Sequence, residues 1–157
     1  MKKVVIAALL VIALSILVAA PVFATANTKL DVIHDSAGNG TLDMLGPVAG
    51  FCNYNQDDAG NLRIVFVIKG GAANTTYQIF LVAGPTHALA TGYTQIGNLT
   101  TNELGRGNSG DIWVPVSTLQ AAPFGNGTRT DHVDVINYGP PEDVFCTTPL
   151  SYTVPAP

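Results

Sequence analysis

Charge is scarce in this sequence. Asp, Glu, Lys and Arg make up 11% of the 157 residues, and the acids outnumber Lys and Arg by 11 to 7. The cationic residues are scattered and form no basic run. Nucleic acid is therefore excluded as a natural partner, because binding its phosphates requires clustered positive charge. The same scarcity argues against an anionic lipid surface.

Cysteine and tryptophan are also rare, with two Cys and one Trp in the whole chain. Two cysteines are too few for a tetrahedral zinc site by themselves. An even number in an exported chain predicts one disulfide, between Cys52 and Cys146. A bridge that closes so long a loop contributes roughly 4–5 kcal/mol in the chain-entropy account. Two buried free thiols are the alternative.

Helical periodicity is nearly absent after residue 26, which argues against a helical bundle. Short segments of β-type composition recur instead, separated by turns rich in Gly and Asn. In the clearest of them, Ile64, Phe66 and Ile68 share one face of an extended chain. The expected strands are 29–34, 41–45, 62–69, 76–82, 93–100, 111–116, 132–137 and 144–147. One helical turn is expected over 117–122, capped by Ser117.

Seven or eight short strands predict a single all-β domain over residues 27–157, an antiparallel β-sandwich of immunoglobulin-like architecture. The true immunoglobulin sequence pattern is missing. Trp113 lies far beyond Cys52, and Val144 stands where that pattern has a Tyr. The segments 76–81, 97–101 and 112–115, with a Gly-rich turn between the last two, resemble small secreted β-sandwich domains. This resemblance implies the fold and no substrate.

The first 26 residues have the order of a secretory signal peptide. Lys2 and Lys3 precede an apolar run that ends at Ala20, and small residues follow at Ala24 and Ala26. Cleavage after Ala26 would leave a secreted or cell-surface protein with no membrane span. An uncleaved anchor is the alternative, because the apolar run is near the lower length limit for a spanning helix.

Two groups of residues invite a catalytic interpretation. Residues 107–111, around Ser109, resemble the Gly-Asp-Ser-Gly-Gly nucleophile segment of trypsin-like serine proteases, from which Asn108 and Asp111 depart. The chain is too short for the two barrels of that family, so a Gly-rich turn is expected.

Paired carboxylates can hydrolyse glycosides. Four acids gather near the C-terminal strand: Asp131, Asp134, Glu142 and Asp143. Nothing fixes their separation, and we predict no catalytic residue.

Several residues of the chain are candidate metal ligands. His34, His87 and His132 are candidate ligands with Asp35 or Asp134, and the sequence does not say whether they converge. His132 and Asp134 share a strand face, which suits either a metal or solvent. Residues 53–61 are rich in oxygen ligands for calcium but lack the regular loop order, so a polar hairpin turn is expected. We predict no metal and no cofactor.

Four Asn-x-Thr sequons are candidate glycosylation sites: Asn39, Asn74, Asn98 and Asn126. Tyrosines are the main candidates for lining a carbohydrate or protein surface: Tyr54, Tyr77, Tyr93, Tyr138 and Tyr152. The sequence thus predicts a non-enzymatic secreted or cell-surface module that binds an extracellular protein or carbohydrate, or has a structural role.

Two other functions stay open. Exposed strand edges can accept a neighbour's strand, so the chain could self-associate as an extracellular filament or surface-layer subunit. A metal-binding secreted protein or a small hydrolase is the third reading.

Overall fold

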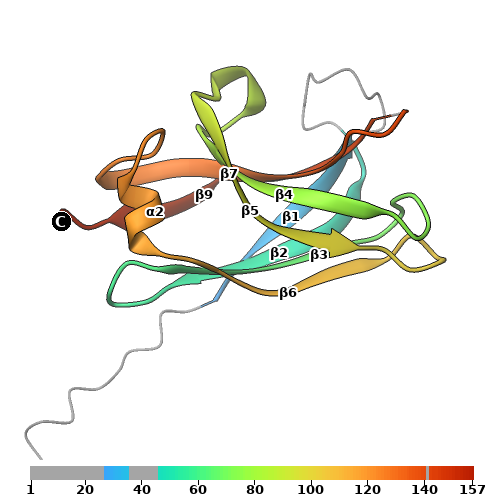
Figure 1. Ribbon diagram of the computed structural model, residues 1–157, viewed down its shortest axis with the longest axis horizontal. Helices are drawn as coiled ribbons and strands as arrows, with labels where there is room; N and C mark the ends of the chain where they lie inside the picture. Colours follow the sequence, from blue (N-terminus) through green and yellow to red (C-terminus); the bar gives the residue numbers. More distant parts are fainter. Residues whose placement is uncertain (1–26, 36–45, 141) are drawn as a thin grey trace, which may run out of the picture.

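The computed structural model describes residues 27–35, 46–140 and 142–157, apart from the side chain of His87 (Figure 1). The described chain is almost entirely β-structure. Its strands are β1 (Thr28–Asp35), β2 (Val48–Gln56), β3 (Leu62–Ile68), β4 (Thr76–Ala83), β5 (Gly92–Thr100), β6 (Gly107–Val114), β7 (Gly127–Asn137), β8 (Asp143–Thr147) and β9 (Leu150–Val154). Two short helical segments, η1 (His87–Leu89) and α2 (Val116–Gln120), complete it.

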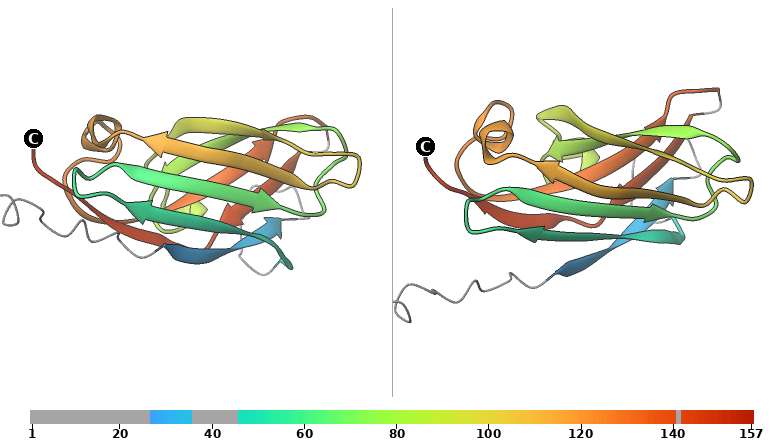
Figure 2. Two further views of the ribbon diagram at one scale, coloured as in Figure 1. Left: turned by 90° about the horizontal axis from the view of Figure 1, so that it is seen from below. Right: turned by 60° about the horizontal axis from the view of Figure 1, so that its bottom comes forward.

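These strands form one continuous antiparallel sheet in the order β5-β4-β7-β8-β1-β2-β3-β6, with β9 paired to the first half of β7. The sheet curls until β6 returns beside β5, where the bridge Thr101–Gly107 links its two edges. Figure 2 shows β6, β3 and β2 side by side, with β1 next to β2 at the edge of the view. The all-β antiparallel prediction is confirmed. A division into two separate sheets is not, because the strand path is unbroken and nearly closes like a barrel.

Glycine permits the close approach at this seam. A Cβ added to Gly97 in β5 would lie 3.0 Å from Ile112 Cδ1 in β6. A Cβ at this position would therefore require the Ile112 side chain to shift slightly.

The core follows from the two-residue alternation of side chains along each strand. In β3, Ile64, Phe66 and Ile68 are fully buried and the residues between them are half exposed, as the sequence predicts. In β4, Tyr77 and Ile79 are buried in the same manner. Each large apolar side chain buried in this way stabilises the fold by about 1.5–3 kcal/mol relative to leaving it exposed.

The sequence missed two strands, β2 and β9, and predicted too short a β6 and β7. The helical turn expected over 117–122 forms as α2, but its N-cap is Pro115 rather than Ser117, and no side chain caps it. The strand expected over 41–45 and the signal peptide over 1–26 lie outside the described residues. Within the described ranges, no helix is long and apolar enough to cross a membrane.

The expected disulfide is wrong, because no bond joins Cys52 and Cys146, which are both buried. Cys52 belongs to the core and lies opposite Leu30 of β1. Cys146 follows the core residue Phe145 in β8, so its side chain points to the other face of the sheet. A disulfide needs two Cβ atoms that face each other at close range. Burial also raises the pKa of the Cys52 thiol to about 12, which keeps it protonated.

Reduction should therefore leave the thermal stability unchanged. We expect the same Tm with and without dithiothreitol, and two titratable thiols per chain after unfolding in denaturant without reductant. A lower Tm under reduction, or a cross-linked peptide holding Cys52 and Cys146, would contradict the placement of the two side chains on opposite faces.

Candidate functional site

The outer face of β2, β3 and β6 carries an ordered set of polar and aromatic side chains. Strand pairing arranges them in two rows across the three strands, because residues that lie opposite one another point to the same face. The first row consists of Asn55, Arg63 and Trp113, and the second of Asn53, Val65 and Asp111. This face is turned toward the viewer in the left view of Figure 2.

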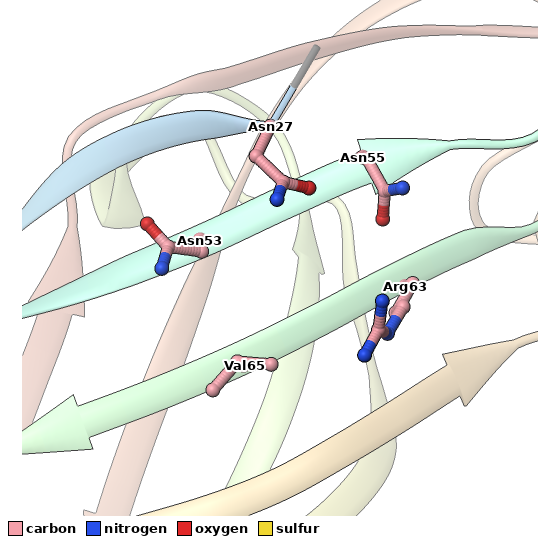
Figure 3. A pocket seen from close by; sticks show the side chains of 5 residues that line it. All are labelled: Asn27, Asn53, Asn55, Arg63 and Val65. Atoms are coloured by element: carbon pink, nitrogen blue, oxygen red, sulfur yellow. The ribbon is translucent and has the colours of Figure 1, made fainter. Parts of the chain in front are cut away.

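A shallow groove of about 80 Å³ lies on this face. Figure 3 shows the side chains that line it, from β2, β3 and the residue before β1, and they include three asparagine amides. The lining residues are Asn27, Asn53, Asn55, Arg63 and Val65. A groove this small holds a few atoms of a ligand while the rest lies along the surface, since enclosed ligand pockets are several times larger.

Charge on this face is balanced by one ion pair. Arg63 Nη2 donates to Asp111 Oδ2 at 2.6 Å, and both side chains are nearly half exposed. This hydrogen bond, reinforced by the carboxylate charge, raises the pKa of the Arg63 guanidinium, so the arginine stays charged. Its Nε is buried and has no hydrogen-bond partner in the described part of the chain. The pair fixes the guanidinium plane next to the groove.

Trp113, the only tryptophan of the chain, ends the first row with 58% of its surface exposed. The neighbouring β6 residues Ile112 and Val114 are buried, which anchors the strand while the indole stays outside. The arrangement offers hydrogen-bond donors and acceptors from amides, one guanidinium and a flat aromatic surface on a rigid support. Such a face can bind a ligand.

The sequence predicted β3 and β6 but not this set of residues. Asn53 and Asn55 were grouped with a calcium loop, although they lie in β2 and point to the sheet face. The alternation of Asn53 and Asn55 along the chain was the available signal. Their proximity to Arg63 and Trp113 depends on strand pairing, which the sequence alone does not fix.

The candidate calcium segment ends in a hairpin turn, as expected. Asp57 accepts hydrogen bonds from both the backbone N and the side-chain Nδ2 of Asn61, each at 2.8 Å. Gly60 supplies the positive φ, +89°, that the turn requires. The Asn61 hydrogen bonds lower the pKa of the Asp57 carboxyl below its usual 3.8.

The ionised form of Asp57 should therefore stabilise the turn. A depressed folded-state pKa gives stability that is present above the unfolded-state pKa and is lost as the pH falls through the folded-state pKa. We expect Asp57→Ala to lower the Tm near neutral pH, and its difference from wild type to shrink in acid, as the pH falls through the folded-state pKa. The neighbouring exposed Asp58 provides the control, Asp58→Ala. An equal difference at both pH values would contradict this role.

The structure does not bring the histidines together. His34 lies in β1 and stacks on the core residue Phe145, with ring centroids 4.4 Å apart. His132 lies in β7 beside the core residue Val133, and so points to the other face of the sheet. Nothing is described of the His87 side chain. Among the described residues, no group of three His, Cys, Asp or Glu side chains could hold a metal ion.

His132 and Asp134 share a strand face, as predicted, but both are buried rather than facing solvent. His132 Nδ1 lies 2.6 Å from the Gly84 carbonyl oxygen, and its Nε2 lies 3.4 Å from Asp134 Oδ1. The pair holds β7 against the segment that follows β4.

The acids near the C-terminal strand separate into different networks. Asp131 is fully buried and accepts both the Arg129 side chain, at 2.9 and 3.0 Å, and the Tyr152 hydroxyl, at 2.6 Å. Asp131 and Asp134 lie three residues apart in β7 and therefore on opposite faces. Glu142 is exposed.

Asp143 makes a contact set that the sequence did not reveal. Its Oδ1 lies 2.7 Å from His34 Nε2, and its Oδ2 accepts the Tyr77 hydroxyl. The Tyr77 oxygen in turn accepts the Ala72 backbone N–H at 2.8 Å. Burial, followed by the hydrogen bond to Asp143, raises the pKa of Tyr77 above its usual value. The network joins β1, β4 and β8 at one end of the sheet.

Removing the Tyr77 hydroxyl should destabilise the fold without creating a large cavity. We expect Tyr77→Phe to lower the free energy of unfolding by about 1–3 kcal/mol, since it leaves Asp143 and the Ala72 amide short of a partner. Tyr138→Phe, at an exposed tyrosine, should have almost no effect. Urea denaturation of both variants measures the difference. If Tyr77→Phe is as stable as Tyr138→Phe, the Tyr77–Asp143 network does not stabilise the fold.

Ser109 has a structural role in this geometry. Its Oγ accepts the backbone N–H of Phe66 at 2.9 Å and donates to the Gly110 carbonyl at 2.8 Å. It bridges the irregularity in the β3–β6 pairing between Val65 and Val67. The Gly-rich turn expected over residues 107–111 is wrong, because these residues belong to β6, in which the pairing with β3 is interrupted by this irregularity.

Three of the four sequons are described. Asn74, Asn98 and Asn126 are all exposed, so their amides are accessible to modification. Asn39 lies outside the described residues.

Comparison of the chain with protein-family models, with curated proteins and with solved structures gives no match.

Proposed function

We propose that this chain is an exported, non-catalytic binding domain that works at or outside the cell surface. Its ligand contacts the outer face of β2, β3 and β6. The observation that carries the proposal is Trp113, held on a paired strand with its indole largely exposed, in one row with Arg63 and Asn55. Tryptophan and arginine are the side chains that most often dominate binding energies.

The support beneath these side chains favours binding without large rearrangement. β3 is paired along its length on both sides, by β2 and β6, and its alternate residues are anchored in the core. A face built on such strands loses little conformational entropy when a ligand arrives. We also propose a sandwich-like flattening of the sheet, in which β1, β2, β3 and β6 form one broad layer.

Export is proposed on the first 26 residues alone, since the two cysteines form no disulfide that would support it. β1 begins at Thr28, so cleavage after Ala26 would remove no residue of a described strand. Three exposed sequons are compatible with an extracellular chain.

The test is truncation of the indole. We expect Trp113→Ala to weaken retention on at least one immobilised polymer from a panel of gelatin, heparin, cellulose, xylan, mannan and chitin by 2 kcal/mol or more, the usual mark of a binding hot spot, at unchanged Tm. Tyr138→Ala is the matched control, because Tyr138 is 62% exposed and does not belong to this face. Undiminished retention of Trp113→Ala, or equal losses in both variants, would refute the proposal.

A further inference from the structure

We infer that the ligand of this face is a neutral carbohydrate chain. The inference rests on the proposed function and names the chemical class of its ligand. Four properties of the face lead to it: its shape, its hydrogen-bonding groups, its charge and its single large aromatic ring.

The shape suits an extended ligand. Neighbouring strands lie about 4.8 Å apart, so a row from β2 to β6 spans about 10 Å and the two rows run side by side. The groove lies between the β2 and β3 ends of these rows (Figure 3). A linear chain can lie along such a surface, with one unit seated in the groove between Asn55 and Arg63 and another over Trp113.

The hydrogen-bonding groups match hydroxyls. Each amide of Asn27, Asn53 and Asn55 offers two donor hydrogens and an acceptor oxygen, and a sugar hydroxyl both donates and accepts. An extended peptide would instead bind by adding a strand to an open edge. β2 and β3 are paired on both sides, so their backbone groups are already used. Recognition on this face must come from side chains.

The charge of the groove lining favours a neutral ligand, although the exposed Lys29 of β1 lies opposite Asn53. The Arg63 guanidinium is matched by the Asp111 carboxylate 2.6 Å away, and the other groove residues are asparagines and a valine. A sulfate or phosphate would have to compete with Asp111 for the arginine, and a cation would have to compete with Arg63 for the carboxylate. A neutral polyhydroxy ligand requires neither exchange.

The indole supplies the remaining contact. One face of a pyranose ring is lined by C–H groups, and it packs on a flat aromatic surface with loss of exposed apolar area. Trp113 is the large aromatic ring that this row presents, and it is the sole tryptophan of the chain. Its fluorescence therefore reports occupancy of this face and of no other.

The experiment titrates the Trp113 emission of the full exported protein with two panels. The neutral panel holds hexasaccharides of glucose, xylose, mannose and N-acetylglucosamine in their common linkages. The second panel holds heparin hexasaccharide, polyglutamate, polylysine and gelatin peptides. We expect saturable changes with at least one neutral hexasaccharide, with an affinity unaffected when the ionic strength is raised from about 0.05 to 0.5 M.

Variants locate the site. Asn53→Ala and Asn55→Ala should each weaken the binding of the responding hexasaccharide by about fivefold, the value of one lost hydrogen bond. Gln78→Ala, an exposed amide on β4, is the matched control and should bind as wild type does. Wild-type affinity in both asparagine variants would overturn the assignment of the groove.

The two proposals fail in different ways. A response to the second panel alone, weakened by salt, overturns the carbohydrate inference and leaves the binding face standing. Silence of the Trp113 emission toward both panels, together with undiminished retention of Trp113→Ala, overturns both.

Discussion

The alternation of side chains along paired strands governs the whole structure. In β3, it sends Ile64 and Phe66 into the core and leaves Arg63 and Val65 outside. A shift of one residue in pairing would exchange these sets and bury a charged guanidinium. The same alternation separates the two cysteines and aligns Asn55, Arg63 and Trp113 in one row. The core, the separation of the two cysteines and the candidate binding face thus all follow from the pairing register of the strands.

The strands that could be predicted from the sequence are those with an apolar residue at every second position. β3 and β4 were recognised because Ile64, Phe66, Tyr77 and Ile79 recur at every second position. β2 was missed because Gly50, Asn53 and Asn55 have low β-propensity, and its inward residues include a glycine and a cysteine. Packing between β1 and β3 outweighs that weak local preference.

The candidate site was less predictable than the strands. Trp113 was placed in a strand, but its neighbours come from β3, about fifty positions earlier in the chain. The sequence pointed to histidines and acids as candidate metal ligands and catalytic groups instead. Those residues divide between separate networks, such as His34 with Asp143 and Asp131 with Tyr152, each of which ties two strands together. These contacts satisfy buried acids such as Asp131, and the candidate site lies on the outer face instead.

The near-closure of the sheet has a dynamic consequence. Among the described strands, β5 and β6 meet through the Thr101–Gly107 bridge and side-chain packing rather than through a hydrogen-bonded ladder. Local opening costs least where few backbone hydrogen bonds must break. The amides along the facing edges of β5 and β6 will exchange with solvent deuterium well before those of β7, which is enclosed by β4, β8 and β9. The sheet therefore opens first along β6, the strand that carries Trp113.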